Sequence, residues 1–199
     1  MKRLHRKDMM CWSTFDCARN MDFNAYLWLR DEGNIVFDPL PLSEHDWSEL
    51  ETFGGAAWVV VSNSDHCRAA HEIAAAFGAQ IAGPRGERDT FPIECQRWIG
   101  EHEPFAAGMR VFELEGSKTP GELAFLIDNH TLITGDLLRA PEGGRLELLP
   151  DAKLQDIEQA KHSLRRLLDY PSIQAVLVGD GWPLFREGYA RLWELLGAG

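Results

Sequence analysis

Short apolar runs alternate with segments of helical periodicity along the chain. Residues 57–61, 109–114 and 175–178 are rich in apolar residues over a strand's length, and such runs are typical of strands covered on both faces. Apolar residues recur at helical spacing over 70–77, and Gly78 is placed to end that helix. The same reasoning predicts further helices from Ser43, over 153–168 and over 183–196.

Two pairs of strands are predicted to form hairpins. Residues 25–30 and 35–38 flank a polar turn at 31–34, and residues 123–127 and 131–134 flank a second turn at 128–130. A short strand is expected at 80–82, before a turn at 83–86. Hairpins mixed with strand–helix units predict an α/β fold of stacked layers rather than a purely parallel sheet.

Length and charge narrow the class of protein. The 199 residues are typical of one domain, which we expect over residues 22–199, with the basic start and the rest of residues 1–21 forming an N-terminal arm. Lys and Arg number 20 against 31 Asp and Glu, a net charge of −11. This balance argues against nucleic acid as a partner and against docking on an anionic membrane. No segment has the length of a membrane-spanning helix.

The cysteines and the N-terminus bear on the compartment. Cys11, Cys17, Cys67 and Cys95 include no C-x-x-C pair, so reduced thiols in a cytoplasmic protein are expected. A local bridge between Cys11 and Cys17 under oxidising conditions remains an alternative. The basic start is not followed by an apolar segment, so no secretory signal is predicted.

Four polar segments stand at breaks beside apolar strands, where α/β folds place their sites. Each segment alone is more typical of a turn or a helix cap. Their order and spacing together are more specific. The four segments are Ser62-Asn63-Ser64-Asp65-His66, Ser117-Lys118-Thr119-Pro120-Gly121, Thr134-Gly135-Asp136 and Gly179-Asp180-Gly181.

In this order the segments resemble the metallo-β-lactamase superfamily, and the resemblance covers about residues 22–192. It implies an αββα four-layer sandwich in which the hairpin ends in a structural Asp, here Asp38. The family's His-x-His-x-Asp-His segment is matched at residues 62–66, with Ser62 and Ser64 at the two leading histidines and Asp65 and His66 at the final pair.

The other segments are matched residue by residue. Lys118 stands at the histidine of the family's Gly-His-Thr-Pro-Gly segment, Asp136 at the bridging Asp, and Asp180 at the last histidine. The resemblance implies that one of the family's two metal sites is lost, because an ammonium has no lone pair to donate and repels a cation. The ligand set of the other site is matched by Asp65, His66, Asp136 and Asp180.

Charge arithmetic supports one cation at this site. Three converging carboxylates against the Lys118 ammonium leave two negative charges, which one divalent ion would neutralise. Oxygen donors with one imidazole suit Zn, Mn or Fe. The alternative is a metal-free pocket in which Lys118, hydrogen bonds and one protonated Asp suffice.

The resemblance therefore implies a metal-dependent hydrolase of a small-molecule substrate with a reduced, mononuclear site. Asp65 and Lys118 are the predicted catalytic residues, with Lys118 stabilising an oxyanion. Ser62, Ser64 and Ser117 are predicted to bind substrate. One alternative is an inactive, metal-free family member that binds a ligand or partner. Another is a serine nucleophile with Lys118 or His66 as base. The sequence predicts neither the substrate nor the oligomeric state.

Overall fold

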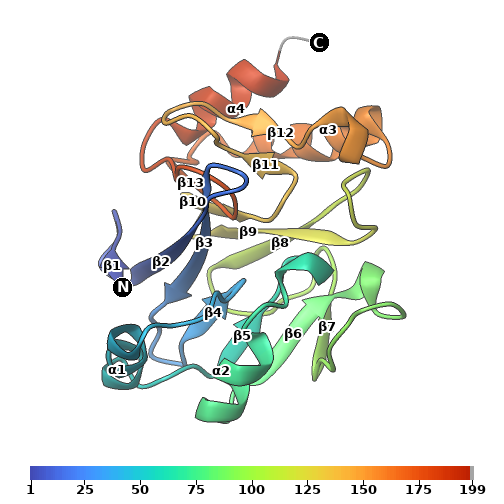
Figure 1. Ribbon diagram of the computed structural model, residues 1–199. Helices are drawn as coiled ribbons and strands as arrows, with labels where there is room; N and C mark the ends of the chain where they lie inside the picture. Colours follow the sequence, from blue (N-terminus) through green and yellow to red (C-terminus); the bar gives the residue numbers. More distant parts are fainter. Residues whose placement is uncertain (198–199) are drawn as a thin grey trace.

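Two β-sheets lie face to face between two pairs of helices in the computed structural model, which describes residues 1–197 (Figure 1). This is the predicted αββα sandwich. The first sheet has seven strands in chain order: β1 (Lys2–Arg3), β2 (Met9–Asp16), β3 (Met21–Trp28), β4 (Ile35–Phe37), β5 (Trp58–Val60), β6 (Gln80–Pro84) and β7 (Arg97–Ile99). Helices α1 (Glu44–Thr52) and α2 (Ala70–Phe77) pack on its outer face.

The second sheet has four strands in the order β13 (Ala175–Val178), β10 (Thr131–Thr134), β9 (Glu122–Ile127) and β8 (Met109–Leu114). Helices α3 (Ile157–Arg165) and α4 (Gly188–Leu196) cover its outer face. A two-stranded ribbon of β11 (Leu138–Arg139) and β12 (Glu147–Leu148) lies beside it. Short 3-10 turns are η1 (Ser64–His66), η2 (Arg85–Glu87), η3 (Asp151–Lys153) and η4 (Arg166–Asp169).

Local sequence accounts for most of these elements. Strands β3 and β4, and strands β9 and β10, pair antiparallel, so both predicted hairpins are confirmed. Ser43 caps α1 by accepting a hydrogen bond from the Asp46 N–H, and Gly78 ends α2 in the left-handed conformation. Helices α1 and α2 cross between β4, β5 and β6, so these strands pair parallel.

The N-terminal segment is not the arm expected for residues 1–21. Strand β2 pairs with β3 over eight residues, and Met9, Met10, Cys11 and Trp12 are buried. The expected boundary at Asp22 therefore falls inside the sheet. The expected domain also includes residues 198 and 199, which lie outside the described residues. The pattern was missed because β2 alternates only weakly between apolar and polar positions.

Two predicted helices are shorter than expected. Asp156 caps α3 by accepting from the Gln159 N–H, so the helix begins at Ile157 instead of residue 153. Helix α4 begins at Gly188 after Glu187, whose φ of 61° lies in the left-handed region, so residues 183–187 are not helical. The four cysteines are free thiols. Within residues 1–197, no helix is long and apolar enough to cross a membrane.

Strand β3 joins the two sheets at the edge where the polar segments gather. The Asn24 side-chain amide donates to the carbonyls of Val178 and Gly181 at 3.0 and 2.7 Å, and the Tyr26 hydroxyl donates to Val178 O at 2.7 Å. Phe23 and Asp180 form an antiparallel bridge. Hydrogen bonds from β3 therefore hold the loop after β13 in place.

Asn24→Ala should destabilise the protein by about 2 kcal/mol, because it removes two buried hydrogen bonds and leaves the carbonyl of Gly181 without a side-chain donor, while Val178 O keeps the Tyr26 hydroxyl. Urea unfolding followed by circular dichroism measures this free energy. Ser13→Ala is the control, since the Ser13 hydroxyl is exposed and donates to the same Asn24 side chain at 2.8 Å. Equal unfolding midpoints for Asn24→Ala and the native protein would contradict the assigned role of Asn24.

Candidate metal centre

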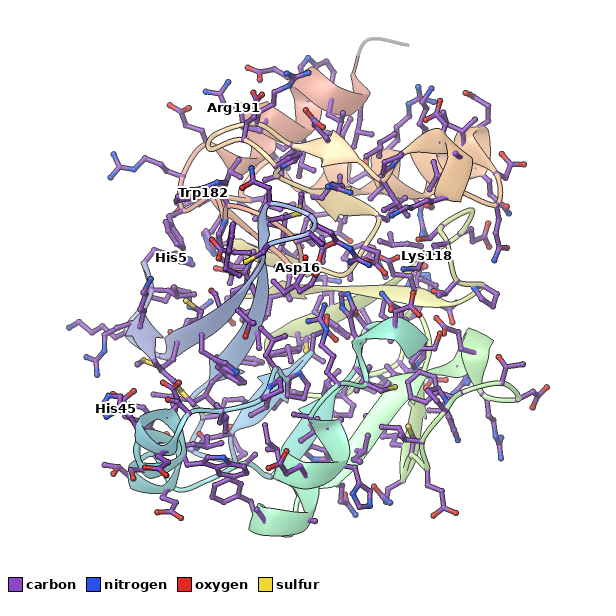
Figure 2. The ribbon with its side chains drawn as sticks, viewed as in Figure 1. His5, Asp16, His45, Lys118, Trp182 and Arg191 are labelled. Carbon is purple, nitrogen blue, oxygen red and sulfur yellow. The ribbon has the colours of Figure 1, made fainter. Side chains whose placement is uncertain are left out.

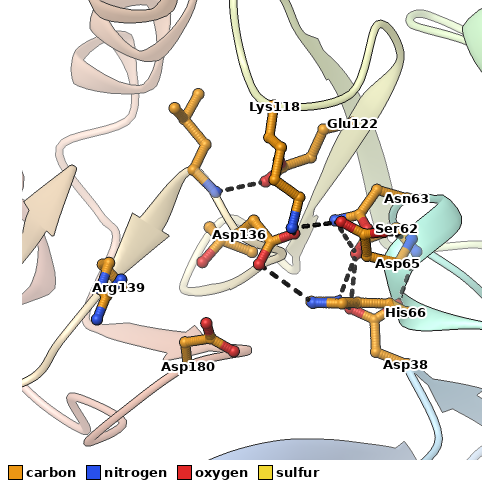
Figure 3. A network of polar contacts seen from close by, with 12 residues as sticks. Asp38, Ser62, Asn63, Asp65, His66, Lys118, Glu122, Asp136, Arg139 and Asp180 are labelled. Carbon is orange, nitrogen blue, oxygen red and sulfur yellow. Dashed lines mark hydrogen bonds and ion pairs between the residues drawn. The ribbon is translucent and has the colours of Figure 1, made fainter. Parts of the chain in front are cut away.

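Four loops from both sheets meet at one edge of the sandwich (Figure 3). His66 lies on η1, which follows β5, and Lys118 lies between β8 and β9. Asp136 follows β10 and Asp180 follows β13. Because β10 and β13 are parallel neighbours, their two carboxylates leave the sheet at the same end.

His66, Asp136 and Asp180 form the centre of this edge. One ligand atom from each lies within 4.8 Å of the others, and all three residues are buried. The contact between His66 Nε2 and Asp136 Oδ1 is 3.6 Å. Gly179 makes this approach possible, since a Cβ on it would lie 2.9 Å from His66 Cε1.

Asp38 holds the imidazole from the opposite side. His66 Nδ1 lies 2.8 Å from Asp38 Oδ2, and the Ser62 hydroxyl donates to the same oxygen at 2.7 Å. The Ser62 backbone N–H donates to Asp38 Oδ1 at 2.7 Å. A proton on Nδ1 leaves the Nε2 lone pair facing Asp136 and Asp180, an arrangement common for metal-binding histidines.

Two cationic side chains, Lys118 and Arg68, lie near the carboxylates but leave one oxygen of each without a hydrogen bond. Lys118 Nζ is 3.2 Å from Asp136 Oδ2, and Arg68 Nη2 is 4.0 Å from Asp180 Oδ1. Asp136 Oδ2 and Asp180 Oδ1 are both buried, and neither accepts a hydrogen bond from the described part of the chain. Lys118 also forms an ion pair with Asp65, whose side chain is half exposed.

The charges shift the pKa values in a consistent way. Burial disfavours the charged ring of His66, but the charge of Asp38 and the contacts with Asp136 and Asp38 outweigh it and raise the pKa of His66 to about 10. Burial also acts on Asp136, but His66 and Lys118 hold the pKa of its carboxyl below the ordinary value. Burial and the charge of Asp136 raise the pKa of Asp180.

Glu122 is a further buried carboxyl next to this centre. Ser117 Oγ donates to Glu122 Oε2 at 2.5 Å, and the Leu137 N–H donates to Oε1 at 2.8 Å (Figure 3). Burial and the charge of Asp136 raise the pKa of Glu122 to about 8. Glu122 thus connects the loop before β9 to the loop that carries Asp136.

The family model of the metallo-beta-lactamase superfamily matches residues 1–198. The chain belongs to the metallo-beta-lactamase superfamily. The fold is similar to that of DIM-1 metallo-beta-lactamase, with a TM-score of 0.75 at 13% identity over 98% of this chain and 95% of that chain. No curated protein matches the sequence.

Two further solved structures share this fold. The metallo-beta-lactamase from Pontibacter korlensis gives a TM-score of 0.74 at 13% identity, covering 98% of this chain and 97% of that one. The di-iron-bound form of TTHA1623 gives a TM-score of 0.69 at 22% identity, covering 91% of this chain and 98% of that chain. At these identities the likeness concerns the fold, so the site must be judged on its own residues.

The match to the superfamily's His-x-His-x-Asp-His segment needs a correction. Residues 62–66 are five positions, whereas the segment spans six, so the two serines and the Asp-His pair cannot all be matched at once. Ser62 and Ser64 precede His66 by four and two residues, the offsets that the leading histidines keep from the Asp. In that register His66 stands at the position of the superfamily's Asp.

The structure separates the residues expected at the site into two groups. His66, Asp136 and Asp180 converge, but Asp65 is not part of this cluster and pairs with Lys118 instead. Ser62 and Ser117 are fully buried and donate to Asp38 and Glu122. Within the described residues, these two hydroxyls are therefore not placed to contact a substrate or to act as nucleophiles.

Sequence reasoning missed Glu122 and Arg68. Glu122 is an acid in a strand whose other residues are apolar, and an acid in such a strand is a signal of a buried functional group. Arg68 follows His66 by two residues and has no local feature that marks it, because its contact with Asp180 joins segments 112 residues apart in the chain.

The residues present fit a single divalent cation. One imidazole and two buried carboxylates converge, and each carboxylate has an oxygen that accepts no hydrogen bond from the described residues. This donor set suits Mn, Fe or Zn. The Lys118 ammonium lies 3.2 Å from Asp136 Oδ2, where it repels a second cation and has no lone pair to donate. Hence the donor set fits one ion and does not fit two.

Glu122→Gln should change how stability depends on pH. A carboxyl whose pKa is raised on folding contributes stability below its unfolded pKa, and this contribution is lost as the pH rises toward about 8. In chelator-treated protein, Glu122→Gln should therefore gain more than about 1 kcal/mol relative to the native chain between pH 5 and pH 8. Urea unfolding at both pH values measures the change.

The matched control is Glu94→Gln, which removes the same charge from an exposed position. It should leave the pH dependence of the unfolding free energy unchanged. If Glu122→Gln and the native protein show the same pH dependence, Glu122 does not titrate as described.

Proposed function

We propose that this protein is a hydrolase of small molecules that holds one divalent cation on His66, Asp136 and Asp180. The observation that carries the proposal is the convergence of three buried donor groups within 4.8 Å, two of whose oxygens accept no hydrogen bond from the described residues. Superfamily membership over residues 1–198 supports metal-dependent hydrolysis. Zn, Mn and Fe are the candidate ions.

Each residue has a defined task in this proposal. A divalent cation bound there supplies Lewis acidity to an attacking water. Asp38 keeps the proton of His66 on Nδ1, so that Nε2 is free to donate its lone pair. Asp136 and Asp180 supply the two negative charges that a divalent cation neutralises.

Lys118 is suited to stabilise the negative charge that develops on a substrate oxygen. Its side chain is 35% exposed, so it can reach a substrate, and the contacts with Asp65 and Asp136 raise its pKa despite its burial. Asp65 positions the ammonium through their ion pair. Ser64 is half-buried, unlike the fully buried Ser62 and Ser117, so we assign substrate contact to Ser64.

The four cysteines support the expected compartment. Cys11 and Cys17 are free, as are Cys67 and Cys95, and free thiols are typical of cytoplasmic proteins. We therefore place the protein in the cytoplasm.

Metal analysis tests the ligand set directly. Native protein purified without chelator should contain about one divalent ion per chain, and Asp136→Asn and Asp180→Asn should weaken Mn²⁺ or Zn²⁺ binding by roughly 100-fold or more, because each removes a ligand charge. Asp38→Asn should weaken metal binding by about 10- to 100-fold, because Asp38 orients His66 without being a ligand itself. Elemental analysis and isothermal titration measure both quantities.

Asp65→Asn is the discriminating control in this series. If Asp65 is a ligand, as the sequence predicts, this variant should lose the ion, whereas the three-residue centre predicts that it retains it. Less than a tenth of an ion per native chain, without activation by Mn²⁺ or Zn²⁺, would contradict the hydrolase proposal.

Lys118→Met should lower kcat about 100-fold or more in a screen of ester, phosphodiester, thioester and β-lactam substrates, because it removes an oxyanion-stabilising cation. Its metal content should not fall, since Lys118 is not a ligand. Lys161→Met is the matched control, because Lys161 contacts Glu158 on the same helix, α3. Equal kcat for Lys118→Met and native protein would remove Lys118 from the reaction.

A metal-free binding protein is the competing function, and one observation favours it. His66 and Lys118 carry positive charge beside Asp136 when no metal is bound. Saturable ligand binding with no metal-dependent turnover would support this alternative.

A further inference from the structure

The ring of Phe23 borders the metal centre and contacts two arginines. Phe23 and Asp180 are paired in an antiparallel bridge, so their side chains leave the backbone on the same face. The guanidinium carbons of Arg19 and Arg68 each lie 5.2 Å from the centre of the Phe23 ring. Two positive charges from distant parts of the chain thus contact the Phe23 ring, and one of them, Arg68, also faces Asp180.

Arg68 is held at this position in an unusual conformation. Its φ of 28° lies in the left-handed region, which a residue with a side chain rarely adopts. Such strain is concentrated at functional sites. Nη1 is buried and finds no hydrogen-bond acceptor among the described residues, and Nη2 is 4.0 Å from Asp180 Oδ1, too far for a hydrogen bond. The guanidinium therefore lacks the acceptors that it requires.

Arg19 reaches the same ring from the turn between β2 and β3. Its backbone N–H donates to Asp16 Oδ1 at 2.9 Å, which holds the turn, while its side chain is exposed. Within residues 1–197, no carboxylate lies within 4.0 Å of its guanidinium. Guanidiniums without a carboxylate partner are the side chains that bind carboxylates and phosphates with paired hydrogen bonds, and two of them contact this one ring.

We propose that Arg19, Arg68 and Phe23 form an oxyanion-binding subsite, so that the substrate carries a carboxylate or phosphoryl group besides the bond that is cleaved. This inference rests on the proposed hydrolase function and specifies its substrate class. A chain with a net charge of −11 repels anions in general. A local arginine pair is the means by which an anionic substrate would be admitted to the site.

Anion binding to chelator-treated protein tests the subsite without a metal in place. Isothermal titration with inorganic phosphate and with oxalate should show saturable binding. Arg19→Gln and Arg68→Gln should each weaken it about tenfold or more, because each removes one charged fork. Tighter binding of phosphate would assign a phosphoryl group, and tighter binding of oxalate a carboxylate.

Arg191→Gln is the matched control. Arg191 lies on α4 on the outer side of the second sheet, where it pairs with Glu187 and Glu194 (Figure 2). This variant removes the same charge and should bind both anions as the native chain does. Arg68→Lys keeps the charge without the planar fork and should give intermediate affinity, so the test does not depend on Arg68→Gln folding. Near-ultraviolet circular dichroism checks the fold of each variant.

Two results would overturn the subsite. One is the absence of saturable binding of either anion to native protein. The other is anion affinity equal to that of the native protein in Arg19→Gln and also in the Arg68 variants, Arg68→Gln or, if that does not fold, Arg68→Lys. Metal content is measured separately, so the two proposals can fail independently. Anion binding in a protein that takes up no metal would contradict the hydrolase proposal and support the subsite. Metal binding without anion binding would support the metal centre and contradict the subsite.

Discussion

Three buried carboxylates around one imidazole impose the electrostatic constraint at this edge of the molecule. Asp38, Asp136 and Asp180 are each less than a tenth exposed, and His66 lies among them. Buried carboxylates need cations, hydrogen bonds or protons. Asp38 is satisfied by Ser62 and His66, whereas Asp136 and Asp180 face cations that leave an oxygen of each without a hydrogen bond. The chemistry of the site follows from this incomplete neutralisation.

The fold serves this constraint by bringing separate segments to one place. The loop after β13 carries Asp180, and β3 of the other sheet holds that loop through Asn24. Glu122 connects the loop of Lys118 to the loop of Asp136 through Ser117 and the Leu137 N–H. Because each connection is buried, the side chains are held in position before any ligand arrives.

Several residues distinguish this centre from the pattern of its superfamily. Lys118 is matched to a histidine of the pattern and places a positive charge of the chain 3.2 Å from Asp136 Oδ2. His66 stands at the position of the pattern's Asp, and Asp180 stands at the position of its last histidine. The cluster therefore still contains carboxylate and imidazole donors. Arg19 and Arg68 add two guanidiniums at the ring of Phe23, whose backbone pairs with Asp180. The site therefore combines one candidate cation position with several fixed cations of the chain.

The sequence by itself determined the layered α/β architecture and both hairpins, and the resemblance of its polar segments to the superfamily's pattern pointed to His66, Asp136 and Asp180. These depend on local periodicity and on polar segments at strand ends, which a single chain displays directly. Only the tertiary structure placed Asp65 beside Lys118 rather than among the ligands, added β2 to the sheet, and brought Arg68 to Asp180. These outcomes depend on side-chain direction and on contacts between distant segments, which local patterns do not encode.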